Sequence, residues 1–234
     1  MAAHMRVTAD PVWLQPYQSL VPARPATDDL FGAPLISDML MASDVRTGAI
    51  PAAFSIHATA PVASPIAQLQ SLSARYGVTP QSDLNQWQKA VAKAIIVDEA
   101  RKQGIDPKLP LAVGTHESGL RMWTDVRQGN VSRNDNRRNG ALASSDFGVM
   151  QVNDHAHAKA FPQVGADLEA NIRYGVDLLA RIERSNGQNL GLGLGEWDGV
   201  LAVYGMGHLP KTASEWEWAK KLVASYKPIV ASLA

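Results

Sequence analysis

The chain has 234 residues, of which 46% are hydrophobic and 19% charged, a composition typical of a globular protein rather than a disordered one. Lysine plus arginine and aspartate plus glutamate number 22 each, so no net charge points to nucleic acid as a partner. The absence of cysteine excludes a cysteine nucleophile, a thiolate zinc site and a disulfide scaffold. No apolar run of about 18 residues occurs, so we expect no membrane span.

The first 80 residues differ in composition from the rest of the chain. Eight of the 14 prolines lie in residues 1–65, and proline interrupts both helices and strand ladders. We therefore expect residues 1–80 to form a tether or a small appended lobe, and residues 81–234 to form one domain. The first 12 residues lack the basic start and apolar stretch of a signal peptide.

The domain begins with two expected helices. Asp83 is a suitable N-cap for apolar residues that repeat at helical spacing from Leu84 onward, and Gly104 is a suitable C-cap. A second, shorter helix is expected after Pro107, ending near Gly119.

Residues 121–147 are polar and show no clear period, which predicts a long loop of functional importance and no paired strands. Further helices are expected from Leu168 to a stop at Gly187, and around Trp197 to Tyr204. Ser214 to Glu217 suggests a capping box that opens the last helix. The expected fold class is therefore predominantly α-helical.

Glu117 is the residue most suggestive of chemistry. It lies four residues after Val113, on the same face of the expected helix, and just before the expected stop at Gly119. Apolar neighbours and the negative end of the helix dipole both favour the protonated carboxyl. A carboxylic acid that keeps its proton near neutral pH is what cleavage of a glycosidic bond requires. On this helix alone, an ordinary surface glutamate is the other interpretation.

Four blocks in this order carry a resemblance. They are Glu117-Ser118, then Gly148-Val149-Met150-Gln151-Val152, then Asn171-Ile172 with Gly175 and Leu179, then Ala202-Val203-Tyr204-Gly205-Met206-Gly207. Over residues 107–210 the chain thereby resembles the lytic transglycosylase and goose-type lysozyme superfamily. Asn153 to His157 continues the second block in a manner similar to goose-type lysozyme. The chain departs from the family at Gly205, where asparagine is usual, and at Asn153, where goose-type lysozymes have aspartate.

The resemblance implies a lysozyme-like helical domain in which Glu117 is the sole general acid and then the base. It implies that Ser118 orients the Glu117 carboxyl and that Tyr204 points its hydroxyl toward it. Met150 and Gln151 would line the saccharide groove, with Asn153 beside them as a substrate-binding candidate.

The other interpretations treat some of these residues as structural. Met150 and Tyr204 would then be packed core side chains, and Asn171 a buried structural amide. No cofactor and no metal are implied. His116-Glu117 begins like a zinc-protease motif, but Leu120 stands where the second histidine would be.

The implied reaction is non-hydrolytic cleavage of the β-1,4 bond between N-acetylmuramic acid and N-acetylglucosamine, giving 1,6-anhydromuramyl products. The expected partner is the peptidoglycan glycan strand, and we expect a monomer acting on the cell wall, whether periplasmic, secreted or phage-delivered. Asn153 cannot act as a base, which favours a transglycosylase over a hydrolase.

Two alternatives stay open. Asp146 and other aspartates in or beside the loop keep a goose-type muramidase possible. The third interpretation is a non-catalytic peptidoglycan-binding component of a phage or secretion machine, but such a binder would not need an acid at Glu117.

Overall fold

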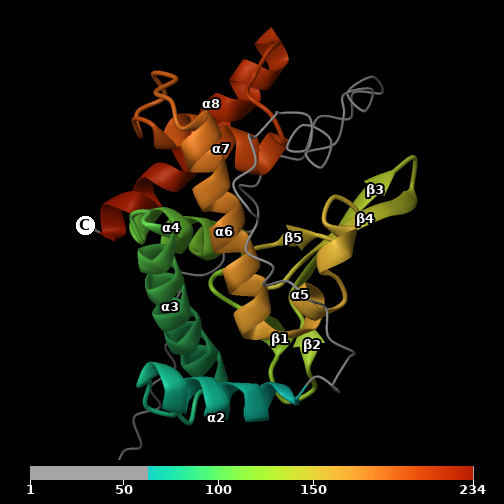
Figure 1. Cartoon of the computed structure of the whole chain (residues 1–234). Helices are drawn as coiled ribbons and strands as arrows, with labels where there is room; N and C mark the ends of the chain where they lie inside the picture. Colours follow the sequence, from blue (N-terminus) through green and yellow to red (C-terminus); the bar gives the residue numbers. More distant parts are fainter. Residues whose placement is uncertain (1–62, 234) are drawn as a thin grey trace, which may run out of the picture.

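A computed structural model describes residues 63–233 (Figure 1). Within this range the chain is predominantly helical, as predicted. The helices are α2 (Pro65–Tyr76), α3 (Leu84–Gln103), α4 (Lys108–Ser118), α5 (Gln163–Ala166), α6 (Leu168–Asn186), α7 (Trp197–Met206) and α8 (Ala213–Ser232), with a short 3-10 helix at Ala158–Ala160. The strands are β1 (Trp123–Asp125), β2 (Asn130–Val131), β3 (Arg133–Arg138), β4 (Ala141–Phe147) and β5 (Val152–Asn153).

The expected caps delimit the first long helices. The Asp83 carboxylate accepts the backbone N–H groups of Asn85 and Gln86, and Gly104 closes α3 in the left-handed conformation. Gly119 ends α4 in the same way, with φ of 62°. The N-cap of the last helix lies two residues earlier than predicted, because Thr212 rather than Ser214 exchanges hydrogen bonds with Glu215.

The core lies where the helices pack on one another. α3 packs along α6, α6 packs on α7, and α4 packs on α8 (Figure 1). Their apolar stripes are almost fully removed from water, which is the main source of stability in such a domain. Fully buried members are Val91, Ile95, Ile96, Leu109, Val113, Ile172, Val176, Leu179, Val200 and Val223.

The expectation of a tether does not hold for residues 63–80, which pack on the rest of the domain. α2 buries Leu69 and Leu72 in the same core as α3. The Trp87 indole N–H donates to the Ser73 hydroxyl at 2.6 Å, and the Gln68 amide accepts the backbone N–H of Leu168. Pro65 stands at the first turn of α2, where proline is compatible with a helix, so its presence did not mark a tether. Residues 1–62, which include the rest of the expected tether, lie outside the described residues.

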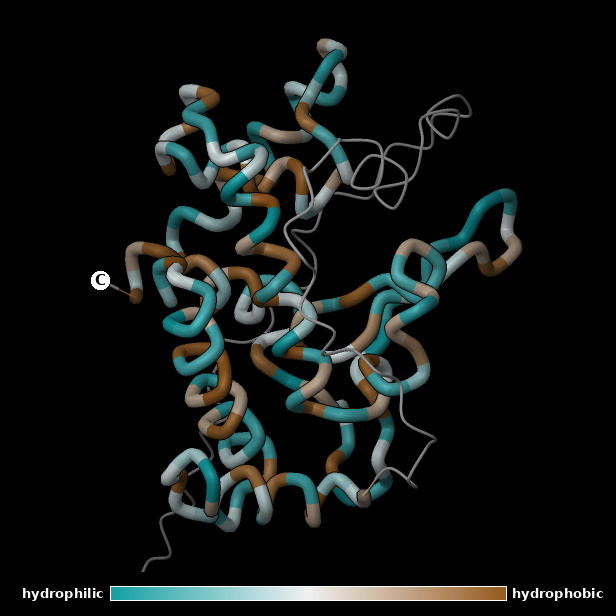
Figure 2. Tube along the Cα trace, in the orientation of Figure 1, coloured by the Kyte–Doolittle hydropathy of each residue, from teal (hydrophilic) through white to brown (hydrophobic). Residues whose placement is uncertain are grey.

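The prediction of a loop without strands over residues 121–147 is also wrong. β1 pairs with β2, and β3, β4 and β5 form a second antiparallel sheet in that order. β3 and β4 are joined at Asn139-Gly140, where both residues have positive φ, as two-residue hairpin turns require. The hairpin projects from the helices and is mostly hydrophilic (Figures 1 and 2). Its strands therefore lack the apolar alternation that identifies a strand from sequence.

Among residues 63–233, no helix is long and apolar enough to cross a membrane.

Candidate active site

Glu117 lies at the C-terminal end of α4, and its side chain is 25% exposed, so it is partly buried yet reachable from solvent. The helix end is held tightly against the next segment. A Cβ atom on Gly114 would lie only 3.0 Å from Leu120 and 3.3 Å from Val149. The absence of a side chain at Gly114 thus lets the turn at residues 148–151 approach the helix that carries Glu117.

Tyr226 of α8 contacts the Glu117 carboxyl directly. Its hydroxyl donates to Oε1 of Glu117 at 3.0 Å, and its side chain is almost fully buried. Burial, followed by the charge of Glu117, raises the pKa of Tyr226 well above its ordinary value. The hydroxyl therefore keeps its proton and serves as a permanent donor. The sequence analysis missed Tyr226, because its spacing from Leu222 and Val223 is that of an ordinary core position.

Tyr204 of α7 does not donate to Glu117 as the resemblance implied. Its hydroxyl donates to the Met150 carbonyl at 2.6 Å. Burial raises the pKa of Tyr204 well above its ordinary value, and the charges of Glu117 and Asp146 act in the same direction. Tyr204 thus lies near both carboxylates, and its hydrogen bond fixes the turn beside them. The tyrosine also packs on the core, in line with the structural interpretation.

Ser118 does not hold the Glu117 carboxyl either. Its hydroxyl oxygen lies 2.9 Å from the Val149 carbonyl, to which it donates, and it accepts the Arg121 backbone N–H at 3.1 Å. Ser118 is buried, so its hydroxyl contacts backbone groups and not solvent. Ser118 therefore joins the end of α4 to the turn at residues 148–151 and positions Glu117 through the backbone.

Met150 is fully buried, so the core interpretation is correct and the groove-lining role is not. Its side chain packs on Gly175 of α6, where a Cβ atom would approach Met150 to 2.5 Å. Gln151 is partly exposed in the same turn, with φ of 46°, and its amide donates to the Gly148 carbonyl at 2.8 Å. Of these two residues, Gln151 is the one that a saccharide could reach.

Asn153 holds a second carboxylate in place. Its amide donates to Oδ1 of Asp146 at 2.8 Å, and its own oxygen accepts the backbone N–H groups of His155 and Ala156. The other Asp146 oxygen accepts the Asn136 amide at 2.9 Å. The sheet thus fixes the Asp146 carboxylate, and a role for Asn153 as a direct substrate ligand would require giving up these bonds.

Asn171 is a buried structural amide, as the alternative interpretation stated. Its oxygen accepts the Met150 backbone N–H at 3.0 Å, and its amide donates to the carbonyls of Phe147 and Val164. This side chain anchors the turn at residues 148–151 to α6. The same turn is thus held from α4 by Ser118, from α6 by Asn171 and from α7 by Tyr204.

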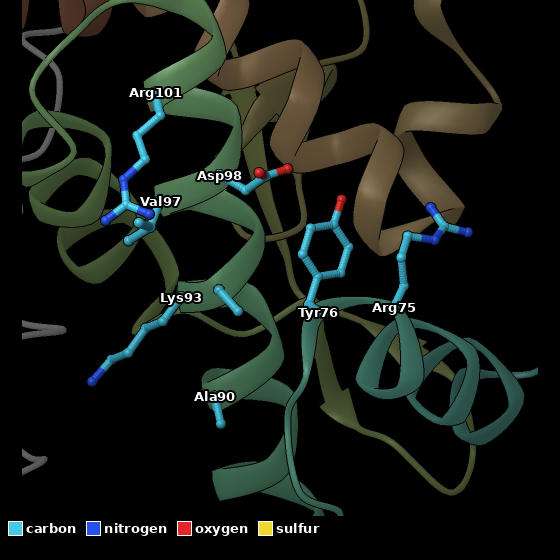
Figure 3. Close-up of a pocket in the computed structure, with 8 residues that line it drawn as sticks. Arg75, Tyr76, Ala90, Lys93, Val97, Asp98 and Arg101 are labelled. Atoms are coloured by element: carbon cyan, nitrogen blue, oxygen red, sulfur yellow. The ribbon is translucent and has the colours of Figure 1, made fainter.

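One hollow of about 630 Å³ lies elsewhere, between the end of α2 and one face of α3 (Figure 3). Its lining comes from these two helices, with Arg75, Tyr76, Lys93, Asp98 and Arg101 among the residues. Arg75 is already paired with Glu169, and Asp98 with Lys102. The hollow includes none of the residues around Glu117.

No protein-family model, no curated protein and no solved structure matches this chain. The functional argument therefore depends on the sequence blocks and on the arrangement of side chains around Glu117. Among residues 63–233, no group of three or more histidine, aspartate or glutamate side chains could hold a metal ion. What the arrangement offers chemically is a partly exposed carboxyl, Glu117, with one oxygen bound by a tyrosine hydroxyl. A second carboxylate, Asp146, acts through its charge on Tyr204, as Glu117 does.

Proposed function

We propose that this protein is a lytic transglycosylase that cleaves peptidoglycan glycan strands between N-acetylmuramic acid and N-acetylglucosamine. The observation that carries the proposal is the position of Glu117, which is a quarter exposed at the end of α4 and bound at Oε1 by Tyr226. The protein would act on the cell wall as a monomer, without a cofactor.

In this proposal the two carboxyl oxygens have different tasks. Within residues 63–233, the polar contacts of the carboxyl, from Tyr226 and His116, both fall on Oε1. Oε2 is thus the oxygen that would meet the glycosidic oxygen. A general acid must lie within hydrogen-bond reach of the atom that it protonates, and a fixed carboxyl meets that condition at little entropic cost.

In the proposed reaction, protonated Glu117 transfers its proton to the glycosidic oxygen as the bond from that oxygen to the muramyl anomeric carbon breaks. The resulting carboxylate then takes the proton of the muramyl 6-hydroxyl as this oxygen bonds to the same carbon. The products are a 1,6-anhydromuramyl end and a free N-acetylglucosamine 4-hydroxyl. No water is consumed, and Glu117 regains its starting protonation, so one carboxyl suffices.

A second candidate is a muramidase, and one observation favours it. Burial raises the pKa of Tyr204, and the charges of Glu117 and Asp146 act in the same direction, so two carboxylates act on one hydroxyl. Hydrolytic glycosidases use such a second carboxylate as a base or nucleophile. Asp146→Asn should therefore lower the rate by about 100-fold or more if Asp146 has that role. It should have a much smaller effect on a transglycosylase that uses Glu117 alone.

The masses of released muropeptides distinguish the candidates. Purified peptidoglycan digested with the wild-type protein should yield products one water lighter than the corresponding reducing-end muropeptides. Reducing-end products would instead identify a muramidase. A folded protein that binds several types of peptidoglycan but releases nothing would favour the non-catalytic, structural role.

A further inference from the structure

The hollow between the end of α2 and one face of α3 has an apolar floor. Ala90, Ala94 and Val97 line it, and their spacing of four and then three residues places them on one face of the helix. All three are partly exposed, although α3 buries most of its other apolar side chains in the core. The volume of about 630 Å³ is typical of a ligand site, but the hollow is a surface depression and not an enclosed cavity. Its shape therefore suits a length of polypeptide better than a small molecule.

Positive charge borders this floor. Lys93 and Arg101 are exposed, and Figure 3 shows both side chains extending on the side of α3 away from Tyr76. The other charged groups in the lining, Arg75 and Asp98, already have ion-pair partners. Among residues 63–233, no carboxylate forms an ion pair with Lys93 or Arg101. Their charges are therefore available to a negatively charged partner.

The positive stripe continues toward the start of α3. Lys89 precedes Lys93 by four residues and so lies on the same side of the helix. Burial lowers the pKa of Lys89, and the charges of Arg121 and Lys93 act in the same direction, against that of Asp83. Repulsion between these neighbouring cations means that the carboxylates around them do not balance their charge. A negatively charged segment along this face would relieve that repulsion.

The sequence outside the described residues contains a segment with the matching chemistry. Residues 25–45 include four aspartates and no glutamate, lysine or arginine, so their net charge is 0 − 4 = −4. No other stretch of 21 residues in the chain is as negative. The segment also has large apolar residues, among them Leu30, Phe31, Leu35, Ile36 and Leu40. It therefore offers both the negative charge and the apolar side chains that would complement the hollow.

We propose that residues 25–45 dock in the hollow between α2 and α3 of the same chain. In this arrangement the aspartates of the segment face Lys93 and Arg101, and its apolar side chains cover the floor of the hollow. Each exposed ion pair contributes little alone, so burial of the apolar side chains supplies most of the affinity and the charges select the partner.

The connection between the segment and the hollow is long enough for docking within one chain. The hollow begins at Arg75 and Tyr76, at the end of α2, and this helix of 12 residues is roughly 18 Å long. Residues 46–62 can span up to about 55 Å. None of the residues around Glu117 lines the hollow, so the proposal does not depend on glycan cleavage.

Nuclear magnetic resonance on the full chain tests where the segment lies. The sequence has no cysteine, so Ser37→Cys provides a single attachment site for a nitroxide spin label within the segment. Docking should broaden the signals of Ala90, Ala94 and Val97, and reduction of the nitroxide should restore them. The signal of Ala219 should stay sharp, because α8 lies toward the opposite end of the molecule from α2 (Figure 1).

Charge reversal in the hollow tests the chemistry of the contact, at a salt concentration where docking is partial. Lys93→Glu combined with Arg101→Glu should lower the docking equilibrium constant by about fivefold, because reversal replaces attraction by repulsion. Lys159→Glu combined with Arg184→Glu changes the charge equally at exposed positions elsewhere, and should leave the broadening unchanged. Adding Asp38→Lys to the reversed hollow should restore part of the broadening.

A mixture of two samples identifies a second copy of the chain as the partner, if that is the true occupant. Isotope-labelled chains without nitroxide are mixed with nitroxide-bearing chains that carry no isotope label. Broadening in this mixture would show that the segment docks on another molecule, and would overturn docking within one chain. Sharp signals from the hollow in the singly labelled chain, or equal broadening in the reversed and control variants, would also overturn the proposal.

Discussion

Tyr226 donates its hydroxyl proton to Oε1 of Glu117 at 3.0 Å, although the two residues are 109 positions apart in the chain. The contact joins the end of α4 to the middle of α8, two helices that also pack on each other. The orientation of the candidate acid thus depends on the C-terminal helix, which lies beyond the four sequence blocks.

Tyr226→Phe removes this hydroxyl and retains the ring that stacks on His116. A hydrogen bond to a charged group contributes roughly 1.5–3 kcal/mol, and Glu117 becomes charged once it has given up its proton, so we expect turnover of peptidoglycan to fall by about tenfold or more. The free energy of unfolding should change by about 1 kcal/mol or less, because Glu117 can be solvated. Tyr174→Phe is the control, since that hydroxyl contacts His157 instead. Full turnover in Tyr226→Phe would exclude a role for the contact.

Asn171→Ala should destabilise the protein strongly. It would leave the buried Met150 N–H and the carbonyls of Phe147 and Val164 without their partner, at a total cost of roughly 3 kcal/mol in the free energy of unfolding. Urea denaturation measures the difference. Asn134→Ala, at an exposed position on β3, should change the value by less than about 0.5 kcal/mol. Equal losses in the two variants would show that the Asn171 bonds are not a main support of the turn.

Gly205 stands where the superfamily that the chain resembles usually has asparagine. A Cβ atom there would lie 2.7 Å from Trp218 and 2.8 Å from Leu222, so the glycine permits α8 to pack closely on α7. Gly205→Asn, which introduces the residue usual in the superfamily that the chain resembles, should lower the free energy of unfolding by about 1–3 kcal/mol. The same substitution made in a Trp218→Leu protein should lower the free energy of unfolding by less than it does in the wild type. Thermal unfolding of the wild type, the two single variants and the double variant measures this difference. Equal losses in the two backgrounds would show that the packing at Gly205 is loose.

Stability at acid pH should depend on His157. Burial lowers its pKa to about 4, and the charge of Arg181 acts in the same direction. As the pH falls, the His157 imidazole of the unfolded chain binds a proton near pH 6.5, before that of the folded protein does. The contribution of neutral His157 to the free energy of unfolding is therefore complete above pH 6.5. It is lost as the pH falls from about 6.5 toward 4.

His157→Gln should flatten this part of the stability profile, because glutamine does not titrate. His155→Gln, at an exposed neighbour, should keep the wild-type slope. Urea midpoints at several pH values between 4 and 7 measure the slopes, and the same slope in His157→Gln as in the wild type would contradict the assignment.

The helices could be predicted because their signals are local. Asp83 and Gly104 bracket one apolar stripe, and a glycine follows directly after the helix that carries Glu117. The β3–β4 hairpin was missed because its strands are polar, although Asn139-Gly140 was a usable turn signal. Helix α2 was missed because Pro65 was interpreted as a break rather than as a helix start.

The site was predictable in position more than in detail. The blocks containing Glu117, Met150 and Tyr204 do come together, but the resemblance gave Ser118 and Tyr204 the wrong hydrogen-bond partners. A hydroxyl on a helix can face several acceptors, and only the packed structure selects one. Tyr226 had no local signal at all, because its partner is 109 residues away.

The most direct test of the central claim compares the rates of muropeptide release by the wild type, Glu117→Gln and Glu196→Gln. The glutamine at position 117 can still accept the Tyr226 hydroxyl, so the fold should persist, but it cannot supply a proton. We predict a loss of at least about 100-fold for Glu117→Gln and a wild-type rate for the exposed control, Glu196→Gln. A folded Glu117→Gln protein that kept more than about a tenth of the wild-type rate would contradict the assignment of Glu117 as the acid.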